Sequence, residues 1–178
     1  MLTEIENVEK NAQLLHSEAE IEAAIQVMAE QINAQLVGTN PVLLSVMNGG
    51  LVIAGKLLTQ LNFPLTIDAV NASRYGNQTS GSDINWKQTP TTDLSGRVVL
   101  IVDDILDKGI TLEAIYQYCQ AQGASKVFSA VLIDKQINKP KPIQADFVAL
   151  QVADHYLYGY GMDYKGYLRN AAGIYACR

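Results

Sequence analysis

Apolar positions along this chain follow two patterns, one typical of amphipathic helices and one typical of buried strands. Between Ser17 and Leu36, apolar residues recur every three or four positions, which predicts a helix packed on a sheet. Its apolar positions are Ile21, Ile25, Met28, Ile32 and Leu36. Ser17 and Glu20 stand three apart at the start of this segment and have the pattern of a capping box. Short apolar runs without polar alternation predict strands covered on both faces, as in a parallel sheet.

The order of these segments predicts an α/β fold. Strands are predicted at residues 41–46, 65–70, 98–102 and 126–133. Further helices are predicted at 51–61 and at about 111–122, the second closed by Gly123. Strands that alternate with helices over short connections favour a mostly parallel central sheet flanked by helices. A stretch rich in Asn, Gly, Ser, Thr and Gln, at about residues 71–97, is expected to be a functional lid loop, with a β-hairpin as the alternative.

Composition limits the class of protein. The 178 residues are 48% apolar and 17% charged, which fits one domain over residues 1–178. A net charge of −5 argues against a nucleic-acid partner, and no apolar run is long enough to span a membrane. Cys119 and Cys177 lack metal-ligand spacing, as do His16 and His155, so a zinc site is not expected. No secretory signal opens the chain, and a cytoplasmic location is the simplest expectation.

The candidate chemistry lies at the end of the strand predicted from Val98. Ligands of parallel sheets bind outside the carboxyl ends of the strands, and there the chain carries Asp103, Asp104 and Asp107. Adjacent carboxylates can bind the hydroxyls of a ribose, directly or through magnesium. The backbone N–H groups of Lys108, Gly109, Ile110 and Thr111 are expected on a turn that opens a helix, which suits a phosphate, and the Thr111 hydroxyl is expected to cap that helix.

The order and spacing of residues 98–111 resemble the 5-phosphoribosyl 1-pyrophosphate (PRPP) motif of type I phosphoribosyltransferases. The resemblance implies the fold of that family, with a small hood formed by terminal segments. It also implies that Asp103 and Asp104 bind the ribose and magnesium, and that residues 108–111 hold the 5-phosphate. Asp107 would act as the general acid/base near purine N7. An Asp-x-Asp phosphatase motif and a glycine-rich phosphate loop are both missing from the sequence.

Two further segments resemble loops of the same family. Met47-Asn48-Gly49-Gly50 resembles the pyrophosphate loop, which often contains a cis peptide, and the resemblance implies that Asn48 and Gly49 bind PRPP. Asn48 stands where a lysine is frequent. Ser73-Arg74-Tyr75-Gly76 resembles the start of the catalytic lid, with Arg74 in the place of a serine and Tyr75 as the pyrophosphate-side contact.

The C-terminal segment, about residues 143–178, resembles the purine-side hood of the hypoxanthine-guanine phosphoribosyltransferase family, most clearly at residues 154–164. By this resemblance Tyr156 stacks on the purine and the Leu157 backbone meets the ring edge. Asp163 would bind a second magnesium, and Arg169 would hold pyrophosphate oxygens.

The sequence leaves open which residue donates a hydrogen bond to the 6-oxo group of the purine. The family places a lysine shortly before the hood, and ahead of Asp146-Phe147-Val148 that position is taken to be Gln144. Gln144 could donate through its amide, or Lys139 or Lys141 could reach in from the loop.

The resemblance implies transfer of phosphoribose from PRPP to hypoxanthine or guanine, giving IMP or GMP and pyrophosphate, with Mg²⁺ and as a homodimer or homotetramer. A preference for xanthine or another purine is one alternative. A non-catalytic regulator is another, and it would need a basic patch larger than the modest cluster of Lys126, Lys135, Lys139 and Lys141.

Overall fold

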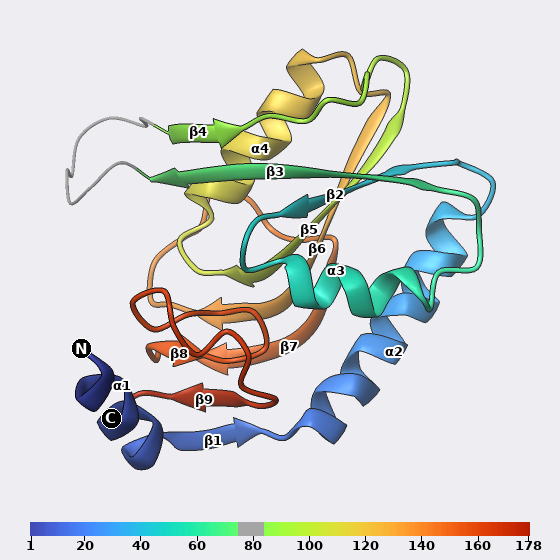
Figure 1. Ribbon diagram of the computed structural model, residues 1–178. Helices are drawn as coiled ribbons and strands as arrows, with labels where there is room; N and C mark the ends of the chain where they lie inside the picture. Colours follow the sequence, from blue (N-terminus) through green and yellow to red (C-terminus); the bar gives the residue numbers. More distant parts are fainter. Residues whose placement is uncertain (75–83) are drawn as a thin grey trace.

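A six-stranded sheet forms the centre of the computed structural model, which describes residues 1–74 and 84–178 (Figure 1). The strand order is β4-β3-β2-β5-β6-β7. All neighbours are parallel except β3 and β4, which are antiparallel. The strands are β2 (Val42–Val46), β3 (Thr66–Arg74), β4 (Ile84–Gln88), β5 (Val98–Leu106), β6 (Lys126–Gln136) and β7 (Phe147–Ala153). The predicted mostly parallel α/β sheet is confirmed.

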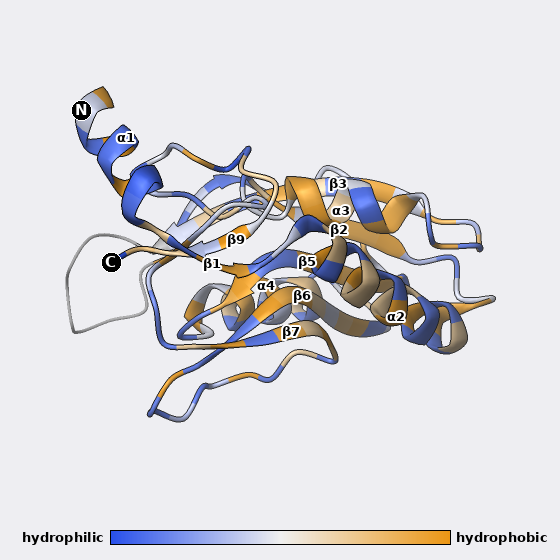
Figure 2. Ribbon diagram, turned by 90° about the horizontal axis from the view of Figure 1, so that it is seen from below, coloured by the Kyte–Doolittle hydropathy of each residue, from blue (hydrophilic) through white to orange (hydrophobic). Residues whose placement is uncertain are grey.

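Helices cover both faces of this sheet because its strands are apolar on both sides. α2 (Glu18–Leu36) and α3 (Leu51–Leu58) share one core with Leu100 and Val102 of β5. α4 (Ile110–Ala121) shares the other core with Val99 and Ile101 of the same strand. Successive side chains of a strand point to opposite faces, so one uninterrupted apolar run supplies both cores. Figure 2 shows the central strands and the inner sides of the helices as the most hydrophobic ribbon.

A second, three-stranded antiparallel sheet forms the hood. It has the order β1-β9-β8 and combines β1 (Gln13–His16), β9 (Ile174–Ala176) and β8 (Leu157–Tyr158). α1 (Leu2–Asn11) precedes β1, so the two ends of the chain lie side by side (Figure 1). The hood therefore comes from both terminal segments, as expected. β7 lies within the residues assigned to the hood, about 143–178, but it pairs with β6 in the central sheet.

Most predicted elements occur close to their predicted bounds. The capping box of α2 is present, since the Ser17 side chain accepts from the Glu20 backbone and the Glu20 carboxylate accepts from the Ser17 N–H. β5 is longer than predicted and runs to Leu106, because its backbone stays paired with β6 as far as Asp134. Asp103 and Asp104 therefore lie within the strand and not after it. Within the stretch predicted as a lid loop, the end of β3 pairs with β4.

The lid contact Tyr75 lies outside the described residues. Among the residues that are described, no helix is both long and apolar enough to cross a membrane.

Candidate active site

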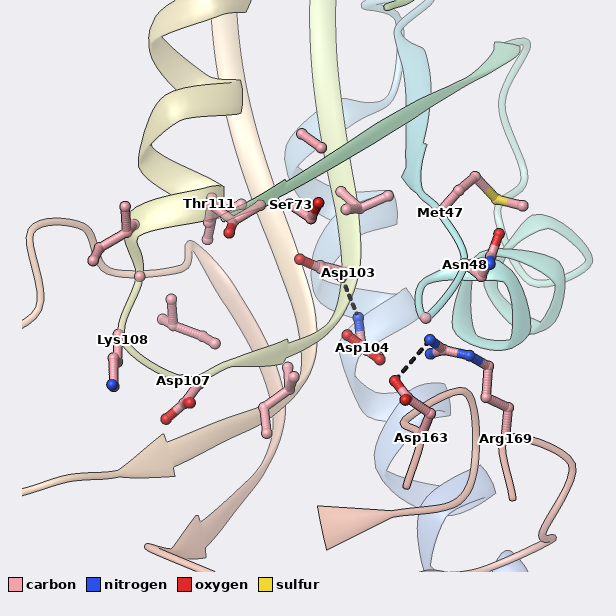
Figure 3. Close-up of a pocket in the computed structure, with 18 residues that line it drawn as sticks. Met47, Asn48, Ser73, Asp103, Asp104, Asp107, Lys108, Thr111, Asp163 and Arg169 are labelled. Carbon is pink, nitrogen blue, oxygen red and sulfur yellow. Dashed lines mark hydrogen bonds and ion pairs between the residues drawn. The ribbon is translucent and has the colours of Figure 1, made fainter. Parts of the chain in front are cut away.

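A cavity of about 430 Å³ opens at the carboxyl ends of β2 and β5 (Figure 3). Four segments that are distant in the sequence line it. They are the loop after β2, the end of β3 at Ala72 and Ser73, the end of β5 with the turn into α4, and the hood near Asp163 and Arg169. In Figure 3, Lys108 and Thr111 lie on one side, Asp163, Arg169 and Asn48 on the other, and Asp103 and Asp104 between them. The carboxyl edge of the parallel sheet thus collects the residues predicted to bind the phosphate and the ribose, and the hood adds Asp163 and Arg169.

The turn from β5 into α4 has the geometry of an anion site. Gly109 is the N-cap of α4 and has a φ of 81°, a left-handed conformation that favours glycine. Among residues 1–74 and 84–178 no side chain caps the helix, so backbone N–H groups of its first turn are available to a ligand in the cavity. The predicted capping role of Thr111 is wrong. α4 begins at Ile110, which puts Thr111 inside the first turn, where it lines the cavity.

Asp103 and Asp104 form a buried acidic pair at the bottom of the cavity, each 8% exposed. The Asp104 N–H donates to Asp103 Oδ1 over 2.9 Å. Burial raises the pKa of Asp103 well above its usual value, and the charge of Asp104 adds to the effect. Burial also raises the pKa of Asp104, although the positive charge of Arg169 opposes this. Two neighbouring buried carboxylates repel each other when both are ionised. A cation bound beside them would stabilise their ionised forms.

The loop after β2 contains a cis peptide between Met47 and Asn48. Gly49 follows, and a Cβ at that position would come within 1.9 Å of Asp104 Oδ2. Any larger residue here would displace the carboxylate of Asp104, which occupies the space beside the backbone. Asn48 and Gly49 both line the cavity, next to the acidic pair.

On the opposite side, the hood contributes an ion pair. Arg169 Nη2 lies 2.7 Å from Asp163 Oδ1, and the Gly166 N–H donates to the other oxygen of Asp163. Arg169 Nη1 donates to the Gly161 carbonyl over 2.6 Å. Gly161 has a φ of 106°, and a Cβ there would lie 2.1 Å from the Gly49 carbonyl oxygen. The hood thus packs directly on the loop after β2, and Arg169 is fixed beside that contact.

Lys135 contacts the predicted site residue Asp107, and the sequence reasoning did not anticipate this contact. Its Nζ lies 3.1 Å from Asp107 Oδ1 and 3.2 Å from Asp154 Oδ1, and it donates to the His155 carbonyl over 3.2 Å. Its side chain is only 13% exposed. The signal was the register of the strands: Leu106 pairs with Asp134, so the next residues, Asp107 and Lys135, come side by side.

The three residues predicted to bind the purine lie outside the lining of this cavity. Tyr156 is on the hood and 55% exposed, and Leu157 begins β8 and is buried. Gln144 is exposed and lines a neighbouring cavity of about 430 Å³, to which Lys135 and Lys139 also contribute.

The ammonium group of Lys141 is engaged in hydrogen bonds within the protein. Its Nζ donates to the Leu106 carbonyl, Asp134 Oδ1 and the Lys135 carbonyl, at 2.7, 2.6 and 2.6 Å. These three acceptors match the three N–H donors of an ammonium group. Lys141 therefore holds the loop after β6 against the end of β5.

Residues 11–165 match the family described as phosphoribosyl transferase domain, and the chain belongs to that family. Among curated relatives, hypoxanthine-guanine phosphoribosyltransferase of Bacillus subtilis (strain 168) is 30% identical over 158 residues. The enzyme of the same name from Streptococcus pneumoniae (strain ATCC BAA-255 / R6) is 32% identical over 158 residues. Each alignment covers 88% of both chains.

Solved structures agree with the family. A hypoxanthine-guanine phosphoribosyltransferase from Bacillus anthracis superposes with a TM-score of 0.88 at 28% identity, covering 93% of this chain and 98% of that one. A hypoxanthine phosphoribosyltransferase from Staphylococcus aureus has a TM-score of 0.89 at 23% identity, covering 96% and 94%, and supports the fold. The predicted type I phosphoribosyltransferase fold is confirmed.

Proposed function

We propose that this protein transfers the phosphoribosyl group of PRPP to hypoxanthine or guanine, forming IMP or GMP and releasing pyrophosphate. The observation that carries the proposal is the single cavity between the turn into α4 and the ion pair of Asp163 and Arg169, with the acidic pair at its base. This arrangement offers separate positions for the two charged ends of PRPP. The names of relatives at 30–32% identity support the same reaction.

The 5-phosphate would bind at the turn formed by Lys108, Gly109, Ile110 and Thr111. Backbone N–H groups and the helix dipole favour an anion there without a cluster of basic side chains. Asp103 and Asp104 would accept hydrogen bonds from the ribose hydroxyls. This assignment of the phosphate to backbone N–H groups suits a protein with a net charge of −5, because its overall charge does not attract a polyanion.

The residues present fit magnesium held jointly with the substrate. Across residues 1–74 and 84–178, no cluster of three or more His, Cys, Asp or Glu side chains could hold a metal alone. Mg²⁺ usually keeps several waters and binds through one or two carboxylates plus substrate phosphates. Burial raises the pKa of both Asp103 and Asp104, and a cation bound beside them would offset that cost. Asp103 and Asp104 would hold one Mg²⁺ and Asp163 a second, and the metal would neutralise charge on the leaving pyrophosphate.

Arg169 and the loop at Asn48 and Gly49 would bind the pyrophosphate. Arg169 now pairs with Asp163, so its guanidinium would exchange or share this partner when pyrophosphate oxygens arrive. Tyr75 is proposed to close over the same end of the substrate and exclude water, which could otherwise capture the oxocarbenium-like ribose.

At the other end of the ribose, Asp107 would handle the purine proton as N9 attacks C1. Lys135 lies next to it and is the cation that we assign to the 6-oxo group, in place of Gln144, Lys139 or Lys141. Lys135 is preferred because its Nζ lies 3.1 Å from the carboxylate of Asp107, the proposed acid/base, whereas the Nζ of Lys141 is held by Asp134 and two backbone carbonyls. Tyr156 would stack on the purine and the Leu157 backbone would meet its edge.

The reaction is tested by supplying PRPP and Mg²⁺ with hypoxanthine, guanine, xanthine or adenine, and measuring nucleotide and pyrophosphate for each base. We expect turnover with hypoxanthine and guanine. Turnover restricted to xanthine would indicate the alternative purine specificity. Binding of PRPP without turnover of any base would favour a regulator. A cytoplasmic location and a homodimer or homotetramer remain predictions, and sedimentation analysis would test the second.

A further inference from the structure

All of α1 except its last residue, Asn11, precedes the segment that matches the family, and polar contacts attach the helix to the hood. Its single buried residue is Ile5, at 6% exposure, and Figure 2 shows the helix projecting from the body of the protein. One buried side chain provides little apolar burial to hold a ten-residue helix in place. The side-chain contacts of α1 with the hood therefore matter for where the helix lies.

The main such contact is made by Glu4. Its Oε1 accepts a hydrogen bond from the Tyr164 hydroxyl over 3.1 Å and lies 2.5 Å from Lys165 Nζ. Lys165 Nζ is also 5.6 Å from the centroid of the Tyr164 ring. Glu4 therefore holds both residues of the turn that directly follows Asp163.

Tyr164 in turn contacts the side chain proposed to stack on the purine. The rings of Tyr156 and Tyr164 are 5.6 Å apart with an interplanar angle of 72°, an edge-to-face arrangement. Tyr156 is 55% exposed, so Tyr164 is an important constraint on the orientation of its ring. An exposed side chain that must be ordered by its ligand costs binding free energy, and a side chain that is already ordered does not.

We propose that Glu4 is a positioning residue for purine binding, which holds Tyr164 edge-on against Tyr156 and so orients the ring on which the purine stacks. The proposal rests on the proposed function, because it assigns Tyr156 to the base. It gives a role in base recognition to a residue outside the family match.

The test compares a ligand with a purine and a ligand without one. Titration calorimetry gives the affinities of GMP and ribose 5-phosphate for the wild type, Glu4→Ala and Tyr164→Phe, and steady-state kinetics give KM for hypoxanthine and PRPP. We expect each variant to weaken GMP binding and raise KM for hypoxanthine roughly 3- to 10-fold, the cost of ordering one side chain. Affinity for ribose 5-phosphate and KM for PRPP should change less than about twofold, because the phosphate site is formed by other segments.

Glu6→Ala is the matched control, because Glu6 is an exposed acid on the same helix. It should leave all four quantities unchanged. The double variant Glu4→Ala/Tyr164→Phe should be no weaker than either single variant, since both remove the same hydrogen bond.

Three outcomes would overturn the proposal. Unchanged GMP affinity in Glu4→Ala and Tyr164→Phe, with or without a lower Tm, would show that the contact serves stability alone. Equal losses for GMP and ribose 5-phosphate would show that the contact acts on the phosphate side. If the wild type itself did not bind GMP more tightly than ribose 5-phosphate, base recognition would fail, and the proposed function would fail with it.

Discussion

Replacement of Lys135 by methionine should reveal which residue donates a hydrogen bond to the 6-oxo group of the purine. Methionine keeps most of the length of the apolar stem but removes the ammonium group that donates to Asp107, Asp154 and the His155 carbonyl. Because the side chain is only 13% exposed, water cannot readily replace a donor that is lost there. The substitution therefore isolates one charged donor.

The magnitude follows from the hydrogen bond that the 6-oxo group would lose. A hydrogen bond to a charged group contributes about 1.5–3 kcal/mol, and each 1.36 kcal/mol corresponds to a tenfold change in rate. We therefore expect kcat/KM for hypoxanthine to fall roughly 10- to 150-fold in Lys135→Met. Adenine carries an amino group at the same ring position, so it cannot accept from Lys135, and its low kcat/KM should not fall in parallel.

The assay is kcat/KM for both bases at saturating PRPP and Mg²⁺, expressed as the ratio of hypoxanthine to adenine. The ratio matters because Lys135→Met also leaves Asp107 without its partner, and that effect applies to both bases. Gln144→Ala is the matched control and should keep the ratio within about twofold. A large fall of the hypoxanthine-to-adenine ratio in Gln144→Ala, with an unchanged ratio in Lys135→Met, would refute the assignment of Lys135. The 6-oxo group would then be assigned to Gln144.

Three other predictions test the remaining parts of the site and the fold. Asp107→Asn should lower kcat by roughly 10²- to 10⁴-fold while PRPP affinity stays within a fewfold, and single-turnover rates near those of the wild type would contradict its role as acid/base. Gly161→Ala should raise KM for PRPP more than about tenfold, because its Cβ would force the hood and Arg169 away from the loop after β2. Gly55→Ala, where a Cβ meets nothing within 4 Å, is its control, and equal KM values in the two variants would contradict the close packing. Although burial alone would raise it, hydrogen bonds from backbone N–H groups hold the pKa of Asp68 at about 2, below the ordinary 3.8. Because the folded-state pKa is lowered, the stabilisation is present above pH 3.8 and is lost as the pH falls through 2. It amounts to at most about 2 kcal/mol, so urea unfolding should show a difference between wild type and Asp68→Asn at pH 5 that shrinks toward pH 2.

Local patterns in the sequence were sufficient for β2, β3, β5 and β6 of the central sheet and for the turn that follows β5. The apolar run of β5 predicts a strand buried on both faces, and the capping box of α2 is a purely local signal. The turn at residues 108–111 belongs to one continuous segment, so its position after a buried strand could be inferred without any distant contact.

The sequence alone left open every feature that depends on register or on contacts between distant segments. β5 ends at Leu106, four residues beyond the predicted end, because pairing with β6 continues through two aspartates of low strand propensity. The same pairing brings Lys135 next to Asp107, 28 positions away, whereas spacing along the chain pointed to Gln144.

The hood illustrates the same limit at the ends of the chain. α1, β1 and β9 are short, and their patterns are too weak to predict an element. They form because the two termini meet, so that β1 pairs with β9 and Glu4 reaches Tyr164. The sequence by itself determined the fold class and the turn that opens α4, since both follow from local periodicity and motif spacing. Only the tertiary structure decided that Lys135 lies beside Asp107 and that α1 contacts the hood through Glu4 and Tyr164, because those contacts join segments that no local pattern connects.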